Sequence, residues 1–346
     1  MGAGRPAAGD SFRRGKRIMS RWPLRWLARR LAQSLLVVLA MTVIVFAGLH
    51  AIGNPVDILI GQDVDQVERA RIIARLGLDQ PLWRQYLAFL HGALRGDLGN
   101  SLVYNVPAIQ LILQRLPATL ELAVAALLLA VLVGVPLGLF AGLYPEHPLS
   151  RVLMTGSIVG FSLPTFWVGL MLIMAFSVRL GWLPSGGRGA TAEWLGVPWS
   201  WLTADGLRHL ILPAINLSLF KVSLVLRLTR AGVREVLPQD WVRFARAKGL
   251  SPQRVVLGHV LRNTMIPLVT VLGLEFGSTI AFAVVTENIF AWPGAGKLIL
   301  DSINALDRPV IVSYLIVVVC LFVTLNLIVD VLYKLLDPRV RLEAAA

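Results

Sequence analysis

The chain has 346 residues, of which 56% are hydrophobic and only 15% are charged, and its mean hydropathy is +0.70. Soluble domains carry about 25% charged residues, so this composition excludes an ordinary soluble protein and predicts an all-α integral membrane protein. The net charge of +13 is concentrated in two segments of an otherwise apolar chain, which argues against nucleic-acid binding.

The first 26 residues form a basic segment that we expect on the cytoplasmic side. Residues 1–30 hold nine Lys and Arg against one acid, and an excess of positive residues marks cytoplasmic loops. The apolar run at 27–50 is long enough to cross a bilayer, which takes about 20 residues. Because no small-residue cleavage site follows it, we interpret this run as an uncleaved first transmembrane helix.

Residues 51–115 form the largest polar connector of the chain. The connector balances six Arg against six acids, so we expect it on the external, periplasmic side. Good helix formers predict short helices at 64–76 and 81–94, with a Gly/Pro turn between them. Two compatible interpretations remain open, a cap packed on the ends of the spans and a docking surface for an external partner.

The region 116–335 contains the remaining apolar runs. Five further runs are long enough to span a bilayer, which brings the predicted total to about six transmembrane helices. With six spans both termini, including the tail 336–346, lie in the cytoplasm, and the connectors 180–207 and 290–308 face outward. Gly134, Gly138 and Gly142, spaced by four residues, predict a close helix–helix contact. The five runs are 118–143, 152–178, 209–228, 266–285 and 310–332.

A basic loop at 231–262 interrupts the apolar runs. Residues 227–262 hold eight Lys and Arg against two acids, which places this loop on the cytoplasmic side. Good helix formers at 240–248 precede Gly249, a helix stop. Ser251 and Pro252 then supply an N-cap and a first-turn proline for a second helix. The segment therefore predicts a helix, a tight turn and a second helix at the membrane surface.

Three interpretations of this loop compete. It is an amphipathic connector resting on anionic lipid, a DNA-reading helix-turn-helix, or a docking element for a cytoplasmic motor. Spans tether both of its ends, which argues against DNA. The small residues Ala245, Ala247 and Gly249 let a partner approach the backbone closely. Arg243, Arg246 and Lys248 add charge for acids or headgroups, and we favour the docking element.

The chain resembles the permeases of ATP-binding-cassette (ABC) importers for dipeptides, oligopeptides and nickel, specifically the first of their two membrane subunits. The similarity extends over nearly the whole chain and is carried by several separate motifs. The motifs are LGLDQP at 76–81, GDLGNS at 96–101, RLPATLEL at 115–122, SLPTFW at 162–167, LPSGG at 183–187, LPA at 212–214, ENIFAWPGAG at 287–296 and DPR at 337–339.

The resemblance implies a type I importer permease fold in the bacterial inner membrane, with 116–335 as the permease core. It further implies a second homologous permease, two cytoplasmic ATPase subunits that bind ATP and Mg, an extracytoplasmic solute-binding protein and the lipid bilayer as partners. It also implies that the loop couples to the ATPases, although Arg243 stands where many importers have a glutamate. The implied coupling residues are Arg243, Phe244, Ala245, Arg246, Ala247, Lys248, Gly249, Leu250 and Ser251.

Ionisable residues inside the spans are costly in lipid and require an explanation. Glu275 either lines a wet path for zwitterionic peptides or makes a helix–helix hydrogen bond. Glu287 either lines the same path, together with Asn288, or fixes the turn that follows it. Lys221 and Asp330 are expected to snorkel to the interface. Glu121, near the start of the second span, is a further ionisable residue within the spans.

The sequence offers no catalytic or metal site, and we expect no cofactor in this chain. The glycines before Lys297 do not match a phosphate loop, because the first glycine of that motif is missing and Leu298 follows the lysine. We interpret them as a tight turn. A secondary transporter, a membrane scaffold and a membrane enzyme are the alternatives to an importer subunit. The solute is left open among dipeptides, oligopeptides, glutathione and nickel complexes.

Overall fold

The computed structural model describes residues 22–51, 67, 71, 73, 74 and 79–336. The chain divides into two compact units, residues 1–95 with 315–323, and residues 96–314 with 324–346. The predicted helix at 64–76 and the tail 337–346 lie outside the described residues. Within the described part, five helices are long and apolar enough to cross a membrane, and a bent helix pair adds a sixth if the pair is counted as one span. The prediction of about six spans is confirmed.

The first unit contains α2 (Trp22–Ala51) and α5 (Leu82–Arg95). Helix α5 confirms the helix expected at 81–94. The two helices meet through the Thr42 and Tyr86 hydroxyls, whose oxygens are 2.9 Å apart, and through Phe46, whose ring centroid is 5.4 Å from that of Tyr86.

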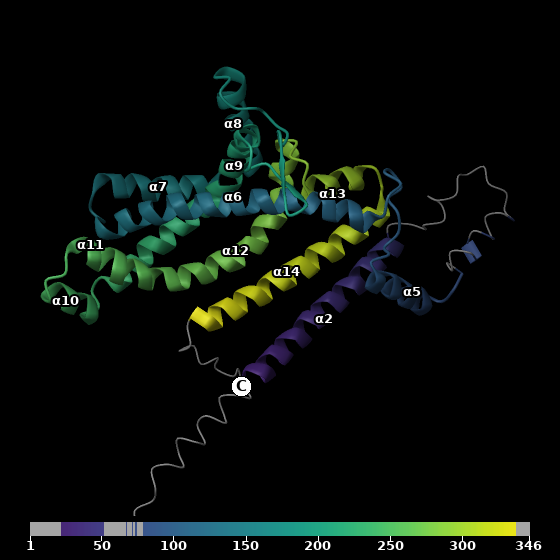
Figure 1. The fold of residues 1–346 in the computed structure, drawn as a ribbon, viewed down its shortest axis with the longest axis horizontal. Coiled ribbons are helices and arrows are strands. Elements are labelled where there is room, and N and C mark those ends of the chain that lie inside the picture. The colour runs from purple at the N-terminus through teal and green to yellow at the C-terminus, as the bar shows by residue number, and fades with distance from the viewer. Residues whose placement is uncertain (1–21, 52–66, 68–70, 72, 75–78, 337–346) are drawn as a thin grey trace, which may run out of the picture. The chain divides into compact units, whose positions relative to one another are not determined.

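The second unit is built around α6 (Ala108–Leu143) and α9 (Ala204–Val236), which run side by side (Figure 1). Gly134 contacts Val225, and Gly142, eight residues later on α6, contacts Val233, eight residues later on α9. The two helices are therefore parallel. At the intermediate position Gly138, an added Cβ would lie 2.6 Å from the Leu226 carbonyl oxygen. The glycine stripe is the surface on which α9 packs, as the spacing predicted.

The third span is not the unbroken helix expected at 152–178. Helix α7 (Pro148–Ser162) and the helix that follows it, α8 (Thr165–Leu172) continued by the π-helix η1 (Ile173–Arg179), meet at an angle of 105°. Pro164 causes the break, because it has no N–H for the helix and it forces Leu163 into an extended conformation, with ψ at 134°.

A small hairpin lies in the connector between η1 and α9. Strands β1 (Ala192–Trp194) and β2 (Val197–Trp199) are antiparallel, with Trp194 opposite Val197. The two turn residues, Leu195 and Gly196, have φ of 55° and 74°. Two positive φ angles in a two-residue loop are typical of the turn that matches the strand twist.

The remaining helices complete the second unit. Helix α10 (Asp240–Ala247) follows α9, and α11 (Pro252–Arg254) continues through the π-helix η2 (Val255–Leu261) into α12 (Arg262–Ile289). After a turn come α13 (Ala295–Asn304) and α14 (Arg308–Leu336). Residues 315–323 of α14 belong to the first unit.

The connectors of the second unit gather at opposite ends (Figure 1). At the start of α6, the Gly187 amide donates to the Phe290 carbonyl over 2.8 Å, which joins the connectors 180–207 and 290–308. Leu139 and Leu143, near the end of α6, pack instead against the cluster that holds α10. The basic loop and the two connectors predicted to face outward therefore lie at different ends of the bundle. Which end faces the cytoplasm stays a prediction.

Candidate functional site

The basic loop folds as the helix and turn that its residues predict. Helix α10 ends with Gly249 in the left-handed region, at φ 75°. The Gly249 amide donates to the Arg246 carbonyl over 2.9 Å, and the Leu250 amide donates to the Ala245 carbonyl over 3.4 Å. This pair of bonds is the Schellman motif, which satisfies the last carbonyls of a helix and favours glycine at the positive φ.

Ser251 and Pro252 occupy the N-cap and first position of α11, as predicted. The Ser251 side chain makes no capping bond there; its carbonyl accepts the Val255 amide over 3.1 Å. Because α11, η2 and α12 follow without a break, the turn at Gly249 and Leu250 connects directly to a transmembrane helix.

One face of α10 is anchored in the protein. Val242 and Ala245 are buried in a cluster with Val233 of α9 and with Val255 and Val260 of η2. The small size of Ala245 therefore serves the packing of α10 on its own chain rather than an outer surface, which corrects the reason the sequence offered for it. Full burial of a side chain such as Val242 stabilises the packing by about 1.5–3 kcal/mol. Because the cluster includes residues of α9 and η2, this packing holds α10 against both elements.

The opposite face of α10 is open and basic. Arg243 lies 3.8 Å from Asp240, and the Lys248 ammonium lies 4.6 Å from the centre of the Phe244 ring. Exposed pairs of this kind contribute little to stability, which leaves the cations available to a partner. Of the predicted coupling residues, Leu250 is half-buried, and the exposed ones are Arg243, Phe244, Arg246, Ala247, Lys248, Gly249 and Ser251.

Lys221 of α9 forms an ion pair with Glu275 of α12 inside the predicted spans. Lys221 is 4% exposed, so it does not snorkel to the interface, and that expectation is wrong. A buried charge is tolerated when an opposite charge is close, and the apposed carboxylate supplies it. Of the two interpretations of Glu275, the helix–helix interaction is present.

Glu287 lies in the interior of the second unit, with 0% of its surface exposed. Its carboxylate accepts the Thr119 hydroxyl over 2.6 Å and the Lys297 amide over 2.8 Å. A Cβ on Gly296 would lie 2.8 Å from that carboxylate, so this glycine serves the turn around Glu287 rather than a phosphate. The contacts favour the structural interpretation of Glu287 over the path. Its neighbour Asn288 is exposed.

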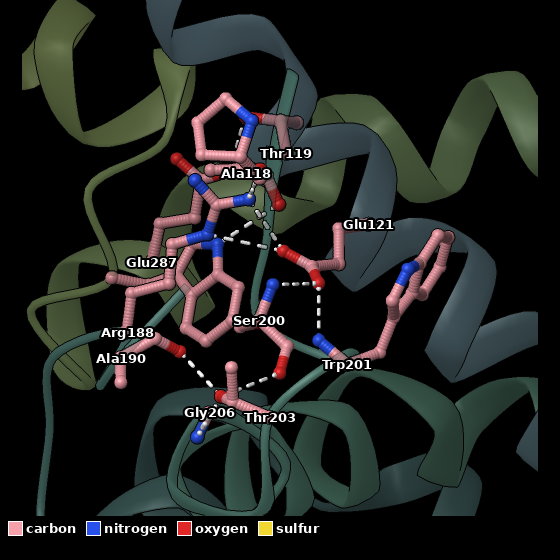
Figure 2. A network of polar contacts seen from close by, with 12 residues as sticks. Ala118, Thr119, Glu121, Arg188, Ala190, Ser200, Trp201, Thr203, Gly206 and Glu287 are labelled. Carbon is pink, nitrogen blue, oxygen red and sulfur yellow. Dashed lines mark hydrogen bonds and ion pairs between the residues drawn. The ribbon is translucent and has the colours of Figure 1, made fainter. Parts of the chain in front are cut away.

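A second buried carboxylate, Glu121 of α6, holds the hairpin connector (Figure 2). The Arg188 guanidinium donates to it over 2.6 Å and 3.0 Å. The backbone amides of Ser200 and Trp201 donate to its other oxygen over 2.7 Å and 2.9 Å. The same cluster includes the Trp292 indole, which donates to the Ala118 carbonyl over 2.9 Å.

Sequence reasoning missed Arg188 as the partner of Glu121. The available signal was an acid inside an apolar helix, which requires a counter-charge, but 67 residues separate the two partners. Asp307 was missed in the same way. It is fully buried and accepts the Ser101 hydroxyl and the Leu102 and Val103 amides over 3.2 Å and 3.3 Å. These carboxylates organise one end of the bundle rather than a catalytic centre.

Comparisons with known proteins agree along nearly the whole chain. Residues 134–342 match the family described as binding-protein-dependent transport system inner membrane component, and residues 23–123 match the N-terminal part of such membrane components. The chain is 42% identical over 332 residues to the di/tripeptide transport system permease protein DppB of Pseudomonas aeruginosa (strain UCBPP-PA14), covering 92% of this chain and 99% of that protein.

Two further relatives extend the range of solutes. The chain is 38% identical over 317 residues to the oligopeptide transport system permease protein AppB of Bacillus subtilis (strain 168), covering 91% and 98% of the two chains. It is 37% identical over 319 residues to the glutathione transport system permease protein GsiC of Escherichia coli O6:H1, covering 92% and 99%. Among solved structures, the MetNI methionine ABC transporter in its inward-facing conformation matches with a TM-score of 0.53 at 16% identity, covering 67% of this chain and 98% of that chain. This last likeness concerns the fold alone.

Proposed function

The chain belongs to the family of inner-membrane components of binding-protein-dependent transport systems, and from this premise we propose that it is the permease subunit of an ATP-driven importer of short peptides. It is a multi-pass protein of the bacterial inner membrane. The high identity to a di/tripeptide permease over 92% of the chain is the observation that carries the proposal. Relatives whose names give oligopeptides and glutathione support small peptides as the solute class over the nickel complexes that the sequence also left open.

In this function the chain forms half of the translocation pathway, and a second homologous permease forms the other half. Two cytoplasmic ATPase subunits bind and hydrolyse ATP with Mg, and an extracytoplasmic solute-binding protein delivers the peptide. The glycine-rich turn before Lys297 is occupied by the carboxylate of Glu287, which supports the assignment of ATP to the partner subunits.

The loop at 243–251 is the proposed contact with the ATPases. Its exposed cations and Phe244 face outward, while Val242 and Ala245 fix α10 to α6, α9 and η2. A displacement of α10 is therefore passed to three helices of the bundle. The motor shifts the permease between two states only if it binds those states with different affinity.

Substitutions at two glycines test the docking assignment. No atom lies within 4 Å of a Cβ placed on Gly249 or on Gly258 of η2. Asparagine tolerates the left-handed backbone, so Gly249→Asn preserves the turn and adds bulk only toward a partner. We expect peptide uptake by the Gly249→Asn transporter to fall about tenfold or more, since overpacking an interface costs about 1–3 kcal/mol. The Gly258→Asn control should transport normally.

Uptake of dialanine into cells and co-purification of the ATPase subunits are the two measurements. Wild-type uptake together with full ATPase co-purification in the Gly249→Asn variant would contradict the docking assignment.

For the translocation path, Glu275 and Asn288 have exposed surface and are retained as proposed lining residues, whereas Glu287 is withdrawn because it is buried.

A further inference from the structure

The ion pair between Lys221 and Glu275 uses only part of the Glu275 carboxylate. Lys221 and the Ser278 hydroxyl both donate to Oε2 of Glu275. Within the part of the chain that the structure describes, no hydrogen bond to Oε1 is present. The Glu275 side chain is 27% exposed, whereas the Lys221 side chain is 5% exposed. The cation is therefore enclosed, and one carboxylate oxygen is open.

The depth of this oxygen restricts what it faces. Glu275 lies within the apolar span Pro267–Ile289, and a carboxylate oxygen exposed to hydrocarbon is strongly unfavourable. In the assembled protein, Oε1 must face water or a donor.

The broken third span lies beside the same ion pair. Phe161, next to the break at Leu163 and Pro164, stacks on Phe220 with ring centroids 4.2 Å apart. The Lys221 ammonium is 5.3 Å from the centre of that Phe220 ring. Non-helical backbone at membrane depth occurs where it is buried in protein or lines a water-filled cavity, and discontinuous helices commonly line transport paths. Residues 161–167 are mostly exposed on this chain, so the described part of this chain does not bury the break, and a position on the cavity is open to it.

We propose that Oε1 of Glu275 lies on a water-filled path and accepts a hydrogen bond from the primary ammonium of the passing solute. Lys221 and Ser278 are positioning residues that hold Oε2 and leave Oε1 free for this contact. The ligand class is a small zwitterion with a free amino group, such as an unblocked dipeptide. This inference rests on the proposed import function and adds a recognition step within the membrane.

The first experiment separates recognition from a purely structural ion pair. In the complete transporter, the double variant Lys221→Met/Glu275→Gln removes both charges and leaves no unpaired one. We expect it to assemble with a KM for dialanine uptake raised about tenfold or more, because hydrogen bonds to charged groups are the strong ones. Lys221→Met alone, which keeps the carboxylate, should retain a lower KM than the double variant. A double variant with the wild-type KM overturns the proposal.

The second experiment needs no change at either charged residue, and its labelling step requires no transport. In a Cys320→Ala background, Phe282→Cys places a thiol two helical turns from Glu275 on the same face, at a site where Phe282 is 66% exposed. A membrane-impermeant methanethiosulfonate with a quaternary ammonium group should label it, and dialanine should slow the labelling.

Leu132→Cys on α6 is the matched control, because Leu132 is 68% exposed but lies on a different helix, and it should stay unlabelled. An unreactive Phe282→Cys, or equal labelling of the two sites, overturns the water-filled path. Failure of dialanine uptake by the wild-type transporter would contradict the proposed function instead, and labelling of Phe282→Cys would still support the path.

Discussion

Replacement of Gly138 by alanine tests the packing that joins the two long parallel helices. The added Cβ would lie 2.6 Å from the Leu226 carbonyl oxygen and 2.7 Å from the Thr229 Cβ. A carbon–oxygen contact of this type normally spans about 3.3–3.6 Å, so the helices must separate by roughly 0.7 Å. The Leu226 oxygen belongs to the backbone of α9 and cannot move away alone. Overpacking of this kind costs about 1–3 kcal/mol.

Gly156→Ala in α7 is the matched control, because no atom lies within 4 Å of a Cβ at Gly156. Both substitutions gain the same helix propensity, about 1 kcal/mol, so the difference between the two variants isolates the steric cost. We expect Gly138→Ala to be less stable than Gly156→Ala by about 1–3 kcal/mol. The measurement is unfolding of the detergent-solubilised protein by sodium dodecyl sulfate, followed by tryptophan fluorescence. Equal stability of the two variants would refute the close contact between α6 and α9.

Two further predictions concern the buried carboxylates. Glu121→Gln leaves the Arg188 guanidinium buried without its counter-charge, so we expect the free energy of unfolding to fall by about 3–5 kcal/mol in the same assay. The double variant Glu121→Gln/Arg188→Met should recover part of this stability. A Glu121→Gln variant as stable as the wild type would contradict the pairing. Thr119→Val removes the donor to Glu287 and the acceptor of the Ala295 amide, so we expect a loss of about 2–4 kcal/mol. Thr119→Ser keeps the hydroxyl and should unfold near the wild type, whereas equal losses in both variants would assign the effect to packing.

The sequence by itself determined the class of the protein, about six spans and the helix–turn–helix in the basic loop. Span length follows from bilayer thickness, and the turn follows from the backbone freedom of Gly249, a property of single residues. The glycine stripe predicted close packing from another property of single residues, because only small side chains let two helices approach closely.

The tertiary structure alone decided which groups meet. Arg188 is 67 residues from Glu121 in the chain, and Lys221 is 54 residues from Glu275, so no local pattern connects them. The burial of Ala245 and Glu287 likewise depends on which helix face is covered by other elements. A single sequence identifies charges that must be compensated in lipid, but their partners come only from the packing of α9 on α12 and of the hairpin connector on α6.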